Sequence, residues 1–184
     1  MPARNIEINP STKVYDLLNT YPELEESLIG IAPPFKKLRN PILRKSIAKI
    51  ATLKNISSVG DIPLNELINK IKKAVGQSVS DDNYEDEEYF GAKPDWFSAD
   101  KISISINEEK SENKDQMTIV AILKEAKNVK DGEIIELITT FLPAPGIDTM
   151  KSKGYLVWTV KEEDNLIKSY FLKNTEWTKN LIQL

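Results

Sequence analysis

The pattern of hydrophobic and polar positions changes near residue 78 of this 184-residue chain. Before that point, apolar residues recur every three or four positions in short segments, which is typical of amphipathic helices. After residue 94, apolar residues alternate with polar ones or form short runs, which is typical of strands, with helical segments between them. The sequence therefore predicts an α+β protein, with a helical bundle over residues 1–77, an acidic linker over 78–94 and a second domain over 95–184.

The short helices of the first domain carry recognisable start and stop signals. Ser, Asn and Thr cap the first turn of a helix well, and Pro fits its first position. Gly allows the backbone to leave a helix. The predicted helix starts are Ser11, Pro22, Asn40, Thr52 and Leu64. The predicted stops are Gly30, Gly60 and Gly76, the last one after an apolar stripe of Leu64, Leu67, Ile68, Ile71 and Val75.

The second domain is predicted to follow the order β-α-β-α-β-β. Isoleucine and serine alternate over residues 102–106, as in a half-buried strand, and residues 134–139 form a nearly continuous apolar strand. Residues 155–160 and 166–172 are predicted to form a hairpin. Helices are predicted over 117–127, 147–153 and 175–184. This order suits a two-layer sandwich with both central helices on one face, in which parallel strands lie beside the antiparallel hairpin.

The predicted linker is strongly acidic. Residues 81–88 contain six carboxylates in eight positions and no apolar period. We expect such a run to be solvated and mobile. It lacks the ligand spacing of a calcium-binding EF-hand loop, so no metal site is predicted there.

The chain contains no cysteine and no histidine. This excludes thiol nucleophiles, disulfides, imidazole catalysis and nearly every zinc, haem or iron–sulfur site that uses those ligands. The sequence also has no Gly-rich phosphate loop, no serine nucleophile elbow and no carboxylate pair spaced for acid–base catalysis. We therefore predict no catalytic residue, no metal site and no cofactor, and do not expect an enzyme.

The composition, 40% apolar and 29% charged, is ordinary for a soluble globular chain. No apolar run approaches the roughly 18 residues that cross a bilayer, and the first residues lack the apolar core of a signal peptide. A cytoplasmic protein without membrane contact is the expectation.

Charge is divided unequally along the chain. Residues 1–77 carry a net charge of +5 (12 Lys/Arg against 7 Asp/Glu), and residues 78–184 carry −8 (13 against 21). No acidic residue falls between Ser27 and Gly60. The basic residues in that interval are Lys36, Lys37, Arg39, Arg44, Lys45, Lys49 and Lys54. Such a division indicates either an anionic partner or attraction between the two halves.

The basic interval is the first candidate site. Lys36, Lys37 and Arg44 could contact phosphates or an anionic polymer, with Phe35 available for stacking. Alternatively, the basic residues form a solvated helix face that neutralises the acidic run 81–88. The second interpretation is favoured because small charged patches are common.

The segment Ala32-Pro33-Pro34-Phe35 is the second candidate. Its two prolines could hold an extended loop that presents Phe35 to a ligand or partner. The alternative is a rigid corner whose Phe35 fills the core of the bundle. We favour the alternative because exposed Phe is uncommon.

The third candidate is the segment that follows the apolar strand 134–139 and opens a helix. It contains Pro143, Pro145, Gly146 and Asp148. Ligands tend to bind at this end of a strand in α/β layers, near the backbone N–H groups of a helix N-terminus. A tight turn whose prolines fix the path of the chain explains the same sequence, and the two interpretations are compatible.

Residues 6–76 resemble a small bacterial helical domain of unknown function. The resemblance rests on Tyr-Pro-Glu-Leu and on Leu-Ile-Gly-Ile-Ala-Pro-Pro-Phe-Lys-Lys-Leu. Relatives of that domain include the N-terminal module of the ScdA type of iron–sulfur-repair protein, and many carry paired cysteines near the position of Ala32–Lys36. This chain has none there.

Residues 101–173 resemble the TusA/SirA sulfur-carrier fold. The resemblance rests on the β-α-β-α-β-β order, the Asp131-Gly132-Glu133 turn and the run ELITTFLPAPGIDTMKSKGY. Those carriers open their first helix with Cys-Pro-x-Pro, where the helix dipole stabilises the thiolate that carries sulfur. The corresponding position falls near Asp115–Thr118, which has neither Cys nor Pro, so a sulfur relay through it is chemically excluded.

Both halves keep the signals of a fold but lack the reactive residues of the families they resemble. We therefore predict a non-catalytic binding or regulatory protein that contacts a protein partner or a small ligand. The resemblance implies a connection with sulfur, iron–sulfur or redox physiology. The alternative is a nucleic-acid-associated protein that uses the basic helices, although the acidic second half would repel the phosphate backbone.

Overall fold

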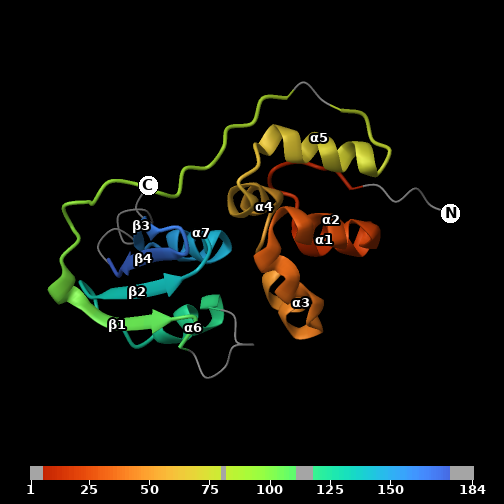
Figure 1. Ribbon diagram of the computed structural model, residues 1–184. Coiled ribbons are helices and arrows are strands. Elements are labelled where there is room, and N and C mark those ends of the chain that lie inside the picture. The colour runs from red at the N-terminus through yellow and green to blue at the C-terminus, as the bar shows by residue number, and fades with distance from the viewer. Residues whose placement is uncertain (1–5, 80–81, 111–117, 175–184) are drawn as a thin grey trace, which may run out of the picture. The chain divides into compact units, whose positions relative to one another are not determined.

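The computed structural model describes residues 6–79, 82–110 and 118–174 (Figure 1). The chain divides into two compact units, Met1–Glu87 and Glu88–Leu184. The first unit is helical, and the second contains a four-stranded sheet with helices, so the predicted α+β class is confirmed. Within the described residues, no helix has the length and apolar character needed to cross a bilayer.

The helical unit consists of short elements joined by tight turns. They are α1 (Val14–Thr20), η1 (Pro22–Leu24), α2 (Glu25–Ile31), η2 (Pro33–Arg39), α3 (Pro41–Ile47), α4 (Leu53–Gly60) and α5 (Leu64–Ala74), where η denotes a 3-10 helix. Their apolar faces meet in a core whose fully buried members include Leu17, Leu53, Leu67 and Ile68. The predicted stripe of α5 therefore faces the core, apart from half-buried Val75.

Helix α4 begins where the sequence predicts. The Asn55 N–H donates to Thr52 Oγ1 (3.3 Å), and the Thr52 N–H donates to Asn55 Oδ1 (2.9 Å). This reciprocal pair is a capping box, in which two otherwise unpaired backbone donors at the helix start are satisfied.

Two other predicted helix boundaries were wrong. Helix α1 starts at Val14, not after Ser11, because the side chains of Asn9 and Thr12 bond within the preceding turn. Helix α2 continues through Gly30 to Ile31. No atom lies within 4 Å of a Cβ built at Gly30, so the glycine meets no packing requirement there.

The second unit follows the predicted β-α-β-α-β-β order. Its elements are η3 (Ala99–Lys101), β1 (Ile102–Asn107), α6 (Thr118–Glu125), β2 (Ile134–Thr139), α7 (Ala144–Ser152), β3 (Leu156–Glu163) and β4 (Leu166–Leu172). The strands are ordered β1-β2-β4-β3. Strands β1 and β2 are parallel, and β3 and β4 form an antiparallel hairpin, as predicted. Strand β4 also pairs antiparallel with β2, which the sequence did not predict. The predicted helix at 175–184 and residues 115–117 of the predicted carrier position lie outside the described residues.

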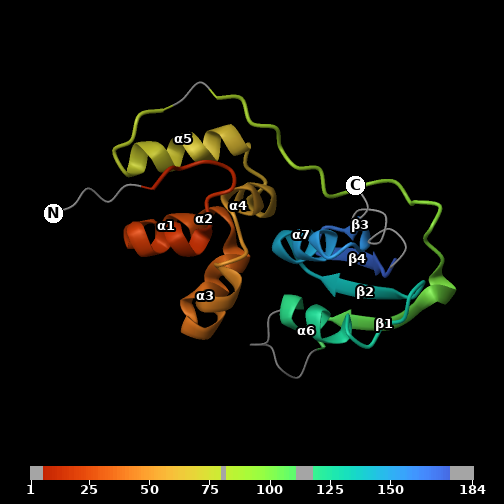
Figure 2. The same cartoon turned by 180° about the vertical axis from the view of Figure 1, so that it is seen from behind.

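Helices α6 and α7 cover one face of the sheet (Figures 1 and 2). They lie next to each other, since a Cβ built at Gly146 of α7 would be 3.9 Å from the Ile119 side chain of α6. The buried residues of this layer include Ile122 of α6 and Ile147 and Met150 of α7. Ile135 and Phe171 are buried residues of the sheet. This layer is the two-helix layer that the sequence predicts.

The other face of the sheet is covered by a segment that the sequence analysis did not assign to it. Trp96 and Phe97 pack against the buried side chains of Ile134, Tyr170 and Leu172. The Phe97 ring lies edge-on to Trp158 and Tyr170, with centroids 4.7 and 4.5 Å apart. Aromatic side chains bury large areas, so this segment adds substantially to the core of the sheet unit.

The acidic run also makes specific contacts where a solvated linker was expected. Asp86 accepts a hydrogen bond from the Leu64 N–H at the start of α5 (2.8 Å), and Tyr84 N–H donates to Asn65 Oδ1 (2.9 Å). Glu87 forms an ion pair with Lys54 of α4. The Asp86 carboxylate caps α5, because Pro63 precedes that helix and offers no side-chain cap.

Residues after Glu87 are held by the sheet unit. The Tyr89 side chain is buried, Gly91 N–H donates to the Thr159 carbonyl (3.3 Å), and Trp158 Nε1 donates to the Gly91 carbonyl (2.8 Å). The contacts of Tyr84, Asp86 and Glu87 differ from the expectation of a solvated, mobile run over residues 81–88.

Candidate functional site

The proline corner is part of the helical core. Residues 33–39 form the 3-10 helix η2, so the extended loop, the less favoured of the two interpretations, is not present around Pro33 and Pro34. Phe35 is 6% exposed and Ala32 is fully buried. Pro33 is exposed and Pro34 half-buried. The structure thus places Phe35 where the favoured interpretation put it, inside the bundle.

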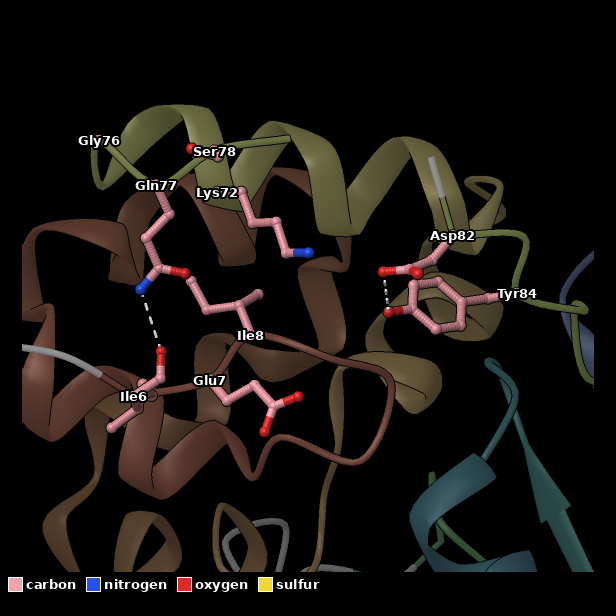
Figure 3. A pocket seen from close by; sticks show the side chains of 9 residues that line it. All are labelled: Ile6, Glu7, Ile8, Lys72, Gly76, Gln77, Ser78, Asp82 and Tyr84. Atoms are coloured by element: carbon pink, nitrogen blue, oxygen red, sulfur yellow. Dashed lines mark hydrogen bonds between the residues drawn. The ribbon is translucent and has the colours of Figure 1, made fainter. Parts of the chain in front are cut away.

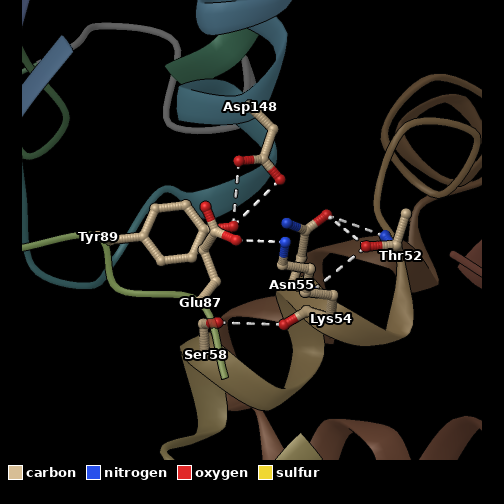
Figure 4. Close-up of polar contacts among 7 residues, drawn as sticks. All are labelled: Thr52, Lys54, Asn55, Ser58, Glu87, Tyr89 and Asp148. Atoms are coloured by element: carbon tan, nitrogen blue, oxygen red, sulfur yellow. Dashed lines mark hydrogen bonds and ion pairs between the residues drawn. The ribbon is translucent and has the colours of Figure 1, made fainter. Parts of the chain in front are cut away.

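Several basic residues of the predicted anion surface are paired with acids. Arg44 forms an ion pair with Glu25 (2.8 Å), and Arg39 forms one with Glu26 (2.7 Å), both acids belonging to α2. Figure 4 shows the group on α4 that includes Thr52, Asn55 and the Lys54–Glu87 ion pair. Lys36 and Lys45 remain exposed, and Lys37 is half-buried. Three of the seven basic residues in the interval, Arg39, Arg44 and Lys54, are therefore paired with acids of the same unit.

The turn before α7 uses its own backbone donors. The N–H groups of Gly146 and Ile147 both donate to the Pro143 carbonyl, at 2.9 and 3.0 Å. Pro145 has no N–H, and Pro143 and Gly146 are buried. The donors predicted to face a ligand at Gly146 thus belong to the helix itself.

Asp148 lies in α7, after this turn, and has a side-chain partner within the sheet unit. The Tyr89 hydroxyl donates to both carboxylate oxygens at 3.1 Å (Figure 4). The Lys151 ammonium lies 5.4 Å from the centroid of the Tyr89 ring. Asp148 therefore acts as an anchor for the chain at Tyr89.

A polar pocket in the helical unit is a site that the sequence analysis missed (Figure 3). Its volume is about 590 Å³. It lies between residues 6–8, the end of α5 and residues 82–84. Its lining residues are Ile6, Glu7, Ile8, Lys72, Gly76, Gln77, Ser78, Asp82 and Tyr84. None of the ten residues predicted as sites lines it. We take this pocket as the candidate functional site.

The end of α5 shapes one wall of the pocket. Gly76 has a φ of +75°, which glycine adopts without strain. The Gln77 N–H donates to the Lys72 carbonyl (2.8 Å), and the Gly76 N–H donates to the Lys73 carbonyl (3.2 Å). These two bonds form a Schellman motif, which turns the chain back at the helix end. The helix stop at Gly76 was predicted from the sequence. The resulting position of Gln77 in the pocket wall was not predicted.

Gln77 connects this wall to the opposite one. Its Nε2 donates to the Ile6 carbonyl (3.0 Å) and to the Tyr21 hydroxyl (3.3 Å). On the third side, the Tyr84 hydroxyl donates to Asp82 Oδ2 (3.0 Å). The pocket therefore has walls held by hydrogen bonds and charged groups of both signs, which suits recognition of a polar molecule.

A second pocket of about 550 Å³ lies beside β1 and α6 in the sheet unit. Its lining includes Ile104, Ile106, Ala121 and Ile138, with Lys110 and Glu125 also present. The described residues contain no group of three or more carboxylates arranged to hold a metal ion.

Similarity to known proteins was found only within the helical unit. Residues 8–68 match a domain of unknown function, DUF1858. No curated protein and no solved structure matches the chain. The match covers α1 to the middle of α5 and supports an N-terminal domain of unknown function.

Proposed function

We propose that this chain is a non-catalytic binding or regulatory protein whose helical unit holds a small polar ligand in the pocket between Ile6–Ile8 and the end of α5. The observation that carries the proposal is the pocket itself. Its volume of about 590 Å³ falls within the range typical of small-molecule sites. Its polar walls are already held in place by Gln77 and Tyr84, so little ordering would accompany binding.

Contact rather than thiol chemistry is proposed because the chain has no cysteine. Many relatives of the helical domain that this unit resembles carry paired cysteines near the position of Ala32–Lys36. In this chain the same corner contributes Ala32 and Phe35 to the packed core. This packing supports a structural role for the corner. We therefore propose that the binding site lies elsewhere in the unit.

A TusA/SirA-like sandwich is the finer proposal for the sheet unit. The β-α-β-α-β-β order and the β1-β2-β4-β3 sheet support it. With both family resemblances, we propose a role in sulfur, iron–sulfur or redox physiology in which the protein senses a ligand or contacts a protein partner. The nucleic-acid alternative loses support from the pairing of Arg39, Arg44 and Lys54 with acids.

The test is a thermal-shift screen of the full chain against small amines, amino acids, carboxylates, phosphates and sugars. A ligand that binds the folded state raises the melting temperature. Hits are then followed by NMR, where we expect shifts of the Gly76, Gln77 and Tyr84 amides. The variant Gln77→Ala should weaken binding, and Glu66→Gln, an exposed change in the first turn of α5, should not.

A screen with no hit, together with a pull-down from the source cell that recovers no partner, would contradict the proposal. A hit whose NMR shifts fall only in the sheet unit would contradict the choice of pocket.

A further inference from the structure

We infer that the ligand of the helical-unit pocket is a small organic cation that carries an ammonium or guanidinium group. The inference rests on the proposed function, since it names the class of ligand for the same pocket. It is drawn from the charges that line the pocket, the helix end that faces it and the way Glu7 is held.

Negative charge exceeds positive charge around the pocket. The lining contains two carboxylates, Glu7 and Asp82, and one ammonium, Lys72. In Figure 3 these three side chains extend from three different segments around the pocket. The net charge of the lining is therefore −1, which favours a cationic guest over an anionic one.

The end of α5 adds to this preference. Gly76, Gln77 and Ser78, which follow the last turn of α5, belong to the lining. A helix C-terminus carries about half a negative charge, and cations near it are stabilised. Lys72 in the last turn offsets part of this field, but it is the sole cation among the described lining residues.

Glu7 is held by the backbone on both sides and is itself available. The Ile6 carbonyl accepts from Gln77, the Glu7 carbonyl accepts from Thr12 Oγ1 (2.9 Å), and the Ile8 side chain is 1% exposed. The Glu7 carboxylate is exposed and has no hydrogen-bond or ion-pair partner among the residues that the structure describes. A fixed backbone with an available carboxylate is suited to bind a donor group of a ligand.

Gln77 provides a further acceptor. Its Nε2 is directed to Ile6 and Tyr21, which fixes the orientation of the amide. The amide oxygen consequently faces the pocket, on the side of Lys72 (Figure 3). Two carboxylates and an amide oxygen match a ligand with several N–H donors, and charge-assisted hydrogen bonds of this kind are the strong ones.

The experiment is isothermal titration calorimetry of the full chain with agmatine, which carries both an ammonium and a guanidinium group. Glutarate, a dianion of comparable length, is the matched probe of opposite charge. We expect agmatine to bind and glutarate not to bind. Each of Glu7→Gln and Asp82→Asn should weaken agmatine binding by roughly fivefold, at the upper end for an exposed ion pair. Added salt should weaken it further.

Two variants serve as controls. Glu66→Gln removes an exposed acid of α5 outside the pocket and should leave agmatine affinity unchanged. Lys72→Gln removes the positive charge of the pocket and should leave agmatine affinity equal or higher. Melting curves of all variants establish that each is folded, since Glu7 and Asp82 are exposed and their loss should not unfold the unit.

Binding of glutarate with NMR shifts at Gly76 and Gln77 would overturn the cation inference and leave the proposed pocket intact. Absence of agmatine binding, or agmatine binding that Glu7→Gln and Asp82→Asn do not change, would also overturn it. If the wider ligand screen is empty as well, the proposed function fails together with the inference.

Discussion

The two units close their cores in different ways. The core of the helical unit comes mainly from its own regular elements, whose apolar stripes meet one another, with Phe35 from a 3-10 helix between them and Ile8 from the segment before α1. The sheet unit completes one face with a segment that precedes its first strand, through Trp96 and Phe97. The difference shows that a unit can depend on residues outside its regular order of strands and helices, where periodicity gives no signal.

Optical probes can measure the two units separately. The described tryptophans, Trp96 and Trp158, belong to the sheet unit, and Trp177 falls in the same stretch of the chain. Tryptophan fluorescence therefore reports the sheet unit, while far-ultraviolet circular dichroism is dominated by the helices.

The largest effect is expected for Phe35→Ala. Removing a buried Phe leaves a cavity and should lower the free energy of unfolding by about 3–5 kcal/mol. Circular dichroism during urea unfolding should show the loss, and tryptophan fluorescence should change little. Lys36→Ala, at an exposed position, should alter stability by less than about 0.5 kcal/mol. Unchanged stability of Phe35→Ala combined with lost ligand binding would place Phe35 in a binding site.

Phe97→Ala tests whether the sheet unit depends on its covering segment. The half-buried ring contacts Trp158 and Tyr170, so we expect a loss of about 2–3 kcal/mol, less than for the more deeply buried Phe35. Tryptophan fluorescence during unfolding provides the measurement. The matched control is Phe90→Ala, since Phe90 is 39% exposed. Equal losses of stability in the two variants would mean that Phe97 contributes no more to the core of the sheet unit than the exposed Phe90 does.

Alkaline pH should affect the same face. Burial, followed by the nearby carboxylate of Glu136, raises the pKa of Tyr170 to about 12. The folded state thus keeps a proton that the unfolded state loses near pH 10, so stability is unaffected below pH 10 and falls between pH 10 and 12. The loss should be no more than about 2 kcal/mol.

The control for this pH dependence is Tyr170→Phe, which cannot titrate. Burial also raises the pKa of Tyr155, so the difference between wild type and Tyr170→Phe isolates the contribution of Tyr170. Urea unfolding followed by fluorescence at pH 9, 10, 11 and 12 gives the comparison. Parallel curves for the two proteins would contradict the assignment.

The smallest effect is expected for Tyr89→Phe. It removes the hydrogen bond to Asp148 but keeps the buried ring, and should cost about 1 kcal/mol. A double-mutant cycle with Asp148→Ala, measured by fluorescence, should show coupling between the two positions. Additive effects would mean that the hydroxyl and the carboxylate do not stabilise each other.

Local signals in the sequence predicted much of the fold. The cap at Thr52 and the stop at Gly76 depend on a few neighbouring residues, and both were found. Alternation and apolar runs gave the strand order along the chain. Predictions failed where short-range alternatives competed, as at Ser11, where Asn9 and Thr12 bond to the turn instead of capping α1.

The candidate site was not predictable in the same way. Ile6 lies about 70 residues before Gln77 and Tyr84 in the sequence, and no motif connects it to them. The ion pairs of Arg39 and Arg44 were missed for a similar reason, because counting charge along the chain ignores which helices pack together. Long-range contacts of this kind do not produce a periodic pattern in the sequence.

The contact of Phe90 with β3 has a consequence for solubility. Strand β3 lies at the end of the sheet order, and Phe90 forms a parallel bridge with Thr159 on it. An outer strand with unpaired backbone groups is a template for pairing with another molecule. The short stretch anchored by Tyr89 occupies part of that template. Loss of the Tyr89 anchor should therefore promote self-association of the folded protein as well as reduce its stability.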